Sequence, residues 1–456
     1  MELAGKRVLV IGLGKTGQST VRFLAGRGAS VVATDDKSLT EMRDATSALS
    51  GLDARLAFGP QDAAILSGVD LIIPSPGVPP TNPLLAEGVK RGVPVLAEIE
   101  VAFRFLKRPV IAITGTNGKT TATTLIGEIL RASGRKAYVG GNIGDPLIGY
   151  VDSLQEEDFA VVELSSFQLE WIERFRPMVA LLLNVTCDHI DYHGTFEAYR
   201  RAKERIFENQ GPGDLAILNA DEPWASPLAR RLRSKVSLFS SKAEIPNGMF
   251  LHGDELILRE NGENRETYPV GMIRIPGTHN LENVMASILA CRACGCPREG
   301  VIEAVSAFRG IAHRIEFAGE KNGVVFYDDS KGTNVGAVAR ALETFSRPVI
   351  LLLGGRDKGG DFDSLAVFIR KGVKKVVLFG EAREALRRII GGIAKTSLAP
   401  TLGKAVEKAY ADAAPGDVIL LSPGCASFDE FKDYKERGDF FKGMVRKIIA
   451  DEIPGA

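Results

Sequence analysis

The segment Ile111-Ala-Ile-Thr-Gly-Thr-Asn-Gly-Lys-Thr-Thr121 runs from a short apolar stretch into a glycine-rich loop. Residues 123–130, which follow it, have a helical pattern, so the loop joins a strand to a helix. Gly115 and Gly118 allow the backbone to curl so that successive amides point inward at phosphate oxygens. The loop departs from the ordinary eight-residue phosphate loop, because Ile113 stands where the leading glycine would be.

The residues that close this loop carry the chemistry of a nucleotide site. Lys119 offers a compact positive charge to the outer phosphates. Thr120 offers a hydroxyl to Mg²⁺, a hard ion that prefers oxygen ligands. A lysine at a helix start is opposed by the helix dipole, so packing alone explains it poorly. The sequence therefore indicates an enzyme that uses ATP.

Short β-branched and leucine-rich runs alternate with helical patterns along the whole chain of 456 residues, which is typical of α/β units with parallel sheets. We expect three α/β domains, at residues 1–97, 98–310 and 311–456. The segment 244–269 is richer in turn residues and predicts a hairpin excursion. The expected strands are 8–11, 30–34, 71–73, 93–96, 110–114, 159–164, 179–185, 324–327, 349–353, 376–379 and 418–421.

Composition limits the classes of partner. The 57 basic and 57 acidic residues balance, which argues against a nucleic-acid binder. No apolar run approaches the ~20 residues that span a bilayer, and no leader pattern precedes the first strand. The five cysteines are odd in number and scattered, as in a reducing compartment. Cys291, Cys294 and Cys296 cluster without a second pair of ligands and are read as a helix end. We therefore expect a cytoplasmic monomer without a membrane span.

A second glycine-rich loop, Gly12-Leu-Gly-Lys-Thr-Gly17, stands between an expected strand and an expected helix. Asp35 follows about twenty residues later, at the end of the next strand, which is the dinucleotide-binding spacing. A pyrophosphate could rest on the helix N-terminus. NAD, another nucleotide diphosphate and a purely structural turn are all compatible with this loop.

Two further residues follow strands of the central domain. Glu163 ends a buried strand pattern, where active-site residues of parallel sheets lie, although a carboxylate capping the next turn is the alternative. His189 follows the next strand, flanked by Asp188 and His193. From spacing alone, this histidine group is either a metal cluster or a hydrogen-bonded turn. Lys203, in the charged helix 196–207, reads as a solvated cation among several.

The shortened loop at 115–120 resembles that of the Mur ligases of peptidoglycan synthesis and of their relatives, the folylpolyglutamate synthetases. Further segments resemble that family's motifs in the family's order: Glu-Leu-Ser-Ser-Phe-Gln at 163–168, Asn-Val-Thr-Cys-Asp-His-Ile-Asp at 184–191, Gly-Thr-His-Asn-Leu-Glu-Asn at 277–283, Ala-His-Arg-Ile-Glu at 312–316, Asp-Asp-Ser-Lys-Gly-Thr-Asn at 328–334 and Leu-Gly-Gly-Arg-Asp-Lys at 353–358. The resemblance implies a Rossmann-like N-terminal domain, a central P-loop domain and a Rossmann-like C-terminal domain.

Within the family, the segments 163–170, 75–77 and 422–432 are similar to the branch that joins D-glutamate to UDP-N-acetylmuramoyl-L-alanine. The Asp-Asn-Pro-Arg motif typical of the branch adding the third amino acid is absent. The resemblance implies an amide ligase in which ATP phosphorylates a carboxylate. The amine then attacks the acyl phosphate, and ADP and phosphate are released.

The same resemblance implies roles for individual residues. Those implied for ATP are Gly115, Thr116, Asn117, Gly118, Lys119, Thr120, Thr121, Asn280, Asn283, Arg314 and Asp329. Those implied for two Mg²⁺ sites are Thr120, Glu163, His189 and Lys203, the last as a carbamate formed with CO₂. Those implied for catalysis are Lys119, Glu163, His189, Lys203 and His313, where His313 positions the acyl group or phosphate unless it only forms a domain-hinge hydrogen bond.

The substrate residues complete the set that the resemblance implies. Those implied for the UDP-linked substrate are Gly14, Lys15, Thr16, Asp35, Asp36, Ser75 and Asn142. Those implied for D-glutamate are Lys331, Thr333, Lys358, Ser427 and Tyr434.

Three alternatives remain at this point. A folylpolyglutamate-type ligase would share the loop at 115–120 but is not expected to have the fingerprint at 12–17. An NAD-dependent oxidoreductase would use residues 12–17 and keep the second loop as structure. A nucleotide-regulated binding module would bind ATP without substrate-dependent hydrolysis.

Overall fold

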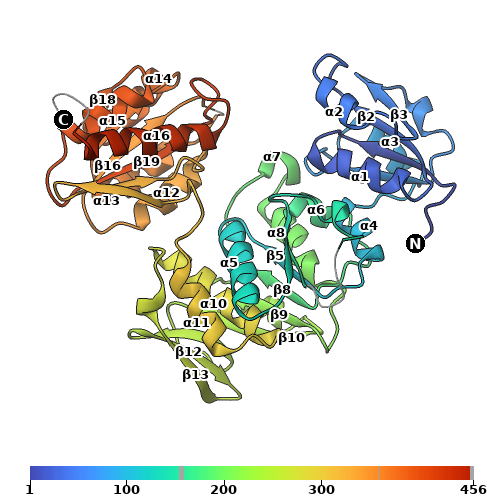
Figure 1. Cartoon of the computed structure of the whole chain (residues 1–456), viewed down its shortest axis with the longest axis horizontal. Coiled ribbons are helices and arrows are strands. Elements are labelled where there is room, and N and C mark those ends of the chain that lie inside the picture. Colours follow the sequence, from blue (N-terminus) through green and yellow to red (C-terminus); the bar gives the residue numbers. More distant parts are fainter. Residues whose placement is uncertain (154–158, 358, 452–456) are drawn as a thin grey trace. The chain divides into compact units, whose positions relative to one another are not determined.

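The computed structural model describes residues 1–153, 159–357 and 359–451 (Figure 1). The chain forms two compact units. The first comprises residues 1–273 and 279–308, and the second comprises residues 274–278 and 309–456. Each unit is an α/β structure with predominantly parallel sheets, as the sequence predicts.

The first sheet of the larger unit is parallel and has the order β3-β2-β1-β4. Its apolar residues alternate between two cores: Val8 and Val10 pack on one face, and Leu9 and Ile11 on the other. The elements are β1 (Arg7–Ile11), α1 (Lys15–Ala25), β2 (Ser30–Asp35), α2 (Arg43–Ala48), β3 (Ala54–Phe58), η1 (Ala63–Leu66), β4 (Leu71–Pro74) and α3 (Pro83–Lys90).

One expected strand of this region is wrong. Residues 93–96 form only an isolated bridge, in which Val95 pairs with Ile72. Two hydrogen bonds join the segment to β4, from Ile72 N to Pro94 O and from Leu96 N to Ile72 O. Pro94 has no amide hydrogen and cannot extend the ladder. The strand β3 was not expected, because Ala54-Arg-Leu-Ala-Phe58 lacks β-branched residues and lies half-exposed at the edge.

The second sheet has the order β13-β12-β11-β10-β9-β8-β5-β7-β6. It is parallel except for β11 to β13, which form antiparallel hairpins in the segment predicted to do so. The strands are β5 (Val110–Thr114), β6 (Ala137–Gly141), β7 (Phe159–Glu163), β8 (Val179–Leu182), β9 (Leu215–Asn219), β10 (Lys235–Ser240), β11 (Gly248–His252), β12 (Glu255–Glu260) and β13 (Glu263–Pro269).

The helices around this sheet follow the strands in the expected alternation. They are α4 (Glu98–Phe105), α5 (Lys119–Ala132), η2 (Leu147–Gly149), α6 (Ser166–Glu170), α7 (Ile190–His193), α8 (Phe196–Glu204), η3 (Arg205–Phe207), α9 (Ala225–Ala229), η4 (Val270–Met272), α10 (Thr278–Ala293) and α11 (Arg298–Ala307). Since β5 lies between β8 and β7, the loops after these three strands open at one edge of the sheet. These loops contain the glycine-rich segment, Glu163 and His189.

The smaller unit has one sheet of order β14-β15-β19-β16-β17-β18. Only the β14–β15 pair is antiparallel. Leu351 and Leu353 pack on one face, while Ile350 and Leu352 pack on the other, as in a sheet covered by helices on both sides. The strands are β14 (Glu316–Lys321), β15 (Val324–Asp328), β16 (Val349–Gly354), β17 (Val373–Phe379), β18 (Thr396–Leu398) and β19 (Val418–Gly424). The helices are α12 (Val335–Glu343), η5 (Phe362–Leu365), α13 (Ala366–Gly372), α14 (Arg383–Ile390), α15 (Leu402–Ala411) and α16 (Tyr434–Ile449).

No helix within the described ranges is both long enough and apolar enough to cross a bilayer.

A buried carboxylate anchors α4 to the segment after α6. Glu100 is fully buried, and its Oε2 accepts hydrogen bonds from the backbone amides of residues 173, 174 and 175 at 2.8–2.9 Å. Its Oε1 accepts a hydrogen bond from Arg104 Nε at 2.6 Å. The charge is therefore compensated by four donors, which is the condition for burying an ionised group without a large cost.

Replacing Glu100 with Gln should lower the free energy of unfolding of the larger unit by about 3 kcal/mol, because one buried partner of an ion pair is lost and an amide group faces other donors. Both tryptophans of the chain, Trp171 and Trp224, lie in that unit, so their fluorescence in a urea titration reports this transition. Glu128→Gln, which removes an exposed pair with Arg131, is the matched control and should leave the midpoint unchanged. An unchanged midpoint for Glu100→Gln would contradict the assigned role.

Candidate active site

The loop after β5 has the conformation that its glycines predict. Gly115 has φ 154° and Gly118 has φ 83°, values that other residues adopt only with strain. A side chain at Gly118 would also collide with Asn283, because its Cβ would lie 2.2 Å from Asn283 Oδ1. Asn283 lies buried on α10, next to Asn280. The structure thus places Asn283 against the loop, and its Nδ2 donates to the Oδ1 of Asn280, the other asparagine predicted to contact adenine.

Asn184, two residues after β8, holds the glycine-rich loop through hydrogen bonds. Its Oδ1 accepts a hydrogen bond from Asn117 N at 2.9 Å, and its Nδ2 donates to Asn117 O at 3.1 Å. Its carbonyl accepts a hydrogen bond from Thr116 N at 2.9 Å. No role was predicted for Asn184 from the sequence, although it is the first residue of the motif at 184–191.

Two lysines converge on one carbonyl group. Lys119 Nζ donates to the carbonyl oxygens of Gly115 and Thr116, each at 2.9 Å. Lys203 Nζ donates to the same Gly115 oxygen at 2.9 Å. Both side chains therefore place an amine group against the backbone of the glycine-rich loop, where a phosphate site needs charged donors.

The interpretation of Lys203 as a solvated cation is wrong. Only 1% of the residue is exposed, and its Nζ lies 4.6 Å from the centre of the Tyr199 ring. Burial and the nearby Lys119 hold the pKa of the Lys203 amine well below its usual range. Tyr199 was not singled out from the sequence, yet its hydroxyl also lies 3.1 Å from Thr116 Oγ1, so it joins α8 to the loop.

Glu163, at the end of β7, has a carboxylate with a hydrogen-bond partner on one of its two oxygens. Its Oε1 accepts a hydrogen bond from Asn142 Nδ2 at 3.0 Å. Its Oε2 is buried and has no hydrogen-bond partner in the described part of the chain. A buried carboxylate oxygen without a partner is costly unless a cation binds it, so this site fits a hard metal ion. Thr120, the hydroxyl predicted to share that ion, is the second residue of α5.

His189 follows β8 with a left-handed backbone, φ 52°, which a non-glycine residue adopts only when its surroundings enforce it. Its side chain is about half exposed, with Nε2 3.7 Å from Asp188 Oδ2. Its ring packs edge-on against Phe167, at 4.9 Å between centroids. The imidazole is therefore available to a ligand on the same sheet edge as Glu163.

The glycine-rich loop after β1 brings the backbone of α1 very close to the end of that strand. A Cβ at Gly17 would lie 1.9 Å from Gly12 O, so only glycine fits. Asp35 Oδ2 accepts a hydrogen bond from Leu13 N at 2.8 Å, so this oxygen supports the loop rather than facing outward to a ribose. Ser75 Oγ donates to Gly12 O at 2.8 Å.

The other residues predicted for the UDP-linked substrate lie around this loop. Gly14 is the N-cap of α1, and Thr16 lies in its first turn. Lys15 Nζ donates to Gly144 O at 2.7 Å and pairs with Asp145 at 2.5 Å, which brings it to the segment of Asn142. Asp36 is exposed just beyond β2.

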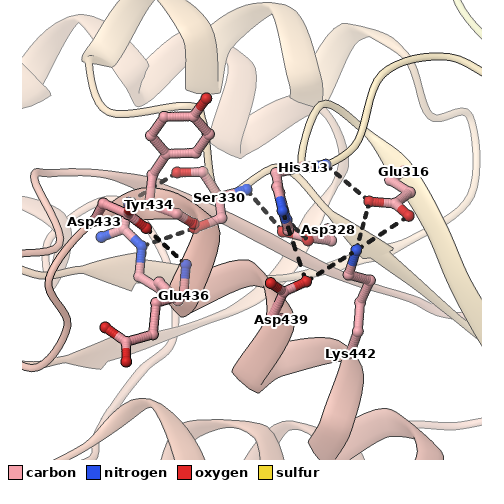
Figure 2. A network of polar contacts seen from close by, with 10 residues as sticks. His313, Glu316, Asp328, Ser330, Asp433, Tyr434, Glu436, Asp439 and Lys442 are labelled. Carbon is pink, nitrogen blue, oxygen red and sulfur yellow. Dashed lines mark hydrogen bonds and ion pairs between the residues drawn. The ribbon is translucent and has the colours of Figure 1, made fainter.

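The smaller unit contains a polar network around His313 (Figure 2). His313 Nδ1 lies 2.7 Å from Asp328 Oδ2, and its Nε2 lies 3.7 Å from Asp439 Oδ1. Lys442 Nζ donates to Glu316 at 3.0 and 3.2 Å, so its ammonium group lies beside this carboxylate. His313 has φ 64°, another enforced left-handed residue. The cluster of His313, Glu316 and Asp328 is thus satisfied by internal pairs and does not require a metal.

Helix α16 supports the residues predicted to bind D-glutamate. Its first residue, Tyr434, lies with its ring 6.1 Å from that of His313, and Lys331 Nζ lies 5.8 Å from the Tyr434 ring centre. Arg437, fully buried and not singled out from the sequence, donates to Ser330 O at 2.9 Å and to Cys425 O at 3.1 Å. It therefore joins the loop after β15 to the segment after β19, where Ser427 is buried.

The remaining predicted residues are placed as follows. Asp329 is buried, which raises the pKa of its carboxyl to about 7, and it accepts a hydrogen bond from Ser422 Oγ at 2.7 Å. Arg314 Nε is buried without a hydrogen-bond partner in the described residues.

Three further predicted residues lie elsewhere. The amide of Thr333 donates a hydrogen bond to the carbonyl of Lys331. Thr121 is buried on α5. Lys358 lies outside the described residues.

Comparison with known proteins gives matches along nearly the whole chain. Three family models match: "Mur ligase MurD-like, N-terminal domain" at residues 6–97, "Mur ligase middle domain" at 113–291 and "Mur ligase, glutamate ligase domain" at 313–425. The UDP-N-acetylmuramoylalanine–D-glutamate ligase of Syntrophus aciditrophicus is 58% identical over 98% of this chain and 99% of its own length. The enzyme of that name from Geobacter metallireducens is 44% identical over the full length of both.

Solved structures agree on the fold. The UDP-N-acetylmuramate–alanine ligase of Thermotoga maritima has a TM-score of 0.59 at 20% identity and covers 97% of this chain and 99% of its own. A pseudomurein peptide ligase of Methanothermus fervidus has a TM-score of 0.59 at 17% identity, covering 97% of this chain and 100% of its own. At these identities the likeness concerns architecture alone. The three family models and the full-length relatives establish that the chain belongs to the Mur ligase family.

Proposed function

We propose that the chain joins D-glutamate to UDP-N-acetylmuramoyl-L-alanine with consumption of ATP, in the synthesis of peptidoglycan precursors. The observation that carries this proposal is the 58% identity, over nearly the whole length of both chains, to a ligase named for that reaction. The convergence of Lys119 and Lys203 on the phosphate loop supports the use of ATP. No observation favours a folylpolyglutamate-type ligase, an oxidoreductase or a regulatory binding module over this reaction.

Amide formation requires activation of the substrate carboxylate, and this requirement gives the loop residues their proposed roles. A carboxylate has no good leaving group, so its oxygen must first take the terminal phosphoryl group of ATP, after which the amine displaces phosphate. Both the carboxylate and the phosphates are anionic, and fixed cations must offset their repulsion. The inward amides of residues 115–120 and the ammonium of Lys119 would hold the transferred phosphoryl group. Asn280 and Asn283 would contact the adenine side, and Arg314 and Asp329 are assigned to ATP as well.

Mg²⁺ is proposed as the cation that the unpartnered Glu163 oxygen holds, with Thr120 and His189 as further ligands in two sites. When bound, Mg²⁺ would neutralise charge on the phosphoryl oxygens. Asn142 would orient the Glu163 carboxylate through its hydrogen bond and also reach the sugar-peptide end of the substrate.

Lys203 is proposed to carry a carbamate. The neutral amine attacks CO₂, a carbon–nitrogen bond forms, and a proton is released, which leaves an anion where a cation would otherwise stand. The lowered pKa favours the neutral amine that this step requires. The resulting anion would relieve the repulsion between the two lysines and would serve as a ligand to the metal.

The substrate sites are assigned to the two Rossmann-like domains. The loop of Gly14, Lys15 and Thr16, with Asp35, Asp36 and Ser75, would bind the uridine diphosphate at the N-terminus of α1. Lys331, Thr333, Lys358, Ser427 and Tyr434 would bind D-glutamate, and His313 would position the acyl group or phosphate. We further propose domains at 1–97, 98–310 and 311–456 and a cytoplasmic monomer.

Phosphate release tests the function. With ATP, Mg²⁺, UDP-N-acetylmuramoyl-L-alanine and D-glutamate present, continuous release is expected, and omission of either substrate should return it to background. Two controls accompany the assay. L-glutamate in place of D-glutamate should not support turnover, and NADH should not bind to the protein. Release without dependence on D-glutamate would refute the ligase assignment.

Chemical rescue tests the carbamate. Lys203→Ala should lose most activity, and added acetate or formate should restore part of it by supplying the missing carboxylate. Lys119→Ala should lose about 3 kcal/mol of transition-state stabilisation and gain nothing from acetate, because it lacks a cation instead. Lys136→Ala, on the exposed surface, is the neutral control. Failure of rescue in a folded Lys203→Ala protein would exclude the carbamate.

A further inference from the structure

His193 is not among the residues assigned to ATP, the metal or the substrates, yet its imidazole is almost completely enclosed. Only 4% of its side chain is exposed, and its Nε2 lies 2.9 Å from Ser166 Oγ. Its Nδ1 faces Glu170 Oε2 at 3.9 Å. Both ring nitrogens therefore face groups on α6, so the ring is placed to fasten that helix rather than to bind a metal.

Both partners of this hydrogen bond lie close in sequence to a residue of the proposed metal site, Ser166 to Glu163 and His193 to His189. Ser166 is the first residue of α6 and lies three positions after Glu163, with a buried side chain. On the other side, His193 N donates to His189 O at 3.0 Å, which closes the single turn α7. The hydrogen bond between His193 and Ser166 thus connects the segment after β7 to the segment after β8.

A stacked aromatic ring fills the space between these two segments. Phe167, next to Ser166, lies nearly parallel to His193, with ring centroids 5.7 Å apart and an interplanar angle of 6°. The same ring contacts His189 at 4.9 Å and Tyr192 at 4.4 Å. Because Phe167 touches both histidines, a movement of His193 would be passed to His189 by packing.

We propose that His193 is a positioning residue that fixes the separation between His189 and Glu163 and thereby sets the affinity for the divalent cation. This inference rests on the metal roles given to those two residues under the proposed function. His189 keeps a left-handed backbone and a half-exposed ring, and such a conformation persists only when neighbouring contacts enforce it. Loss of an outer hydrogen bond that orients metal ligands weakens metal affinity by about 10–100-fold.

Manganese binding measures this effect without turnover. MnCl₂ alone is titrated into the full-length protein, and the electron paramagnetic resonance signal of free Mn²⁺ reports the bound fraction. His193→Ala should bind at least about tenfold more weakly than the unaltered protein. His193→Gln, whose amide can still reach Ser166, should recover part of the loss. His252→Ala, which removes an exposed histidine at the end of β11, is the matched control and should change nothing.

Ser166→Ala removes the same hydrogen bond from its other partner. Because it deletes only a hydroxyl, it still tests the proposal if His193→Ala folds poorly. It should weaken Mn²⁺ binding to a similar degree, and the double variant should be no worse than either single one. In turnover, the Mg²⁺ concentration for half-maximal rate should rise while kcat at saturating Mg²⁺ stays near normal.

Unchanged Mn²⁺ affinity in folded Ser166→Ala or His193→Ala protein overturns the positioning role and leaves the ligase assignment standing. Absence of Mn²⁺ binding by the unaltered protein overturns the metal roles of Glu163 and His189, and this inference with them. Absence of D-glutamate-dependent phosphate release refutes the proposed reaction, which separates the two failures.

Discussion

The carbonyl oxygen of Gly115 accepts hydrogen bonds from the side-chain nitrogens of two lysines, and the site is organised around this convergence. Two charged lysines at one oxygen would repel each other, and Lys203 is buried, which further disfavours its charged form. Such an arrangement is stable only if an anion joins it or one lysine gives up its charge. Phosphates on the loop and a carbamate on Lys203 would each meet that requirement.

The order of strands explains why the participating side chains meet. β5 has β8 on one side and β7 on the other, so residues distant in sequence leave the sheet at adjacent points. Asn184 and Tyr199 then connect to the loop through Asn117 and Thr116, and Asn142 connects to Glu163. The chemistry of the loop therefore depends on the ends of three neighbouring strands being held in register.

Much of the fold could be predicted from sequence, because buried parallel strands leave continuous apolar runs such as Val110–Thr114 and Val349–Gly354. Edge strands such as β3 lack that signal, and Pro94 interrupts a run that otherwise reads as a strand. Among site residues, Lys119 is visible because packing alone poorly explains a lysine at a helix start, and Glu163 is visible because it ends a buried strand, where active-site residues of parallel sheets lie. Lys203 is not visible, since its helix is charged on several faces and its burial depends on Tyr199 and a loop 88 residues away. Arg437 and Asn184 are likewise defined by tertiary contacts.

The proposed reaction makes an acyl phosphate from a substrate carboxylate at this loop, and the fate of a carboxylate oxygen isotope decides whether it does. UDP-N-acetylmuramoyl-L-alanine labelled with ¹⁸O in its carboxylate is turned over with ATP and D-glutamate, and the released phosphate is examined by mass spectrometry or ³¹P NMR. Attack of the carboxylate oxygen on the terminal phosphorus predicts that the label passes into the phosphate with each turnover. Unlabelled phosphate, with amide product formed, would exclude an acyl phosphate made from this carboxylate.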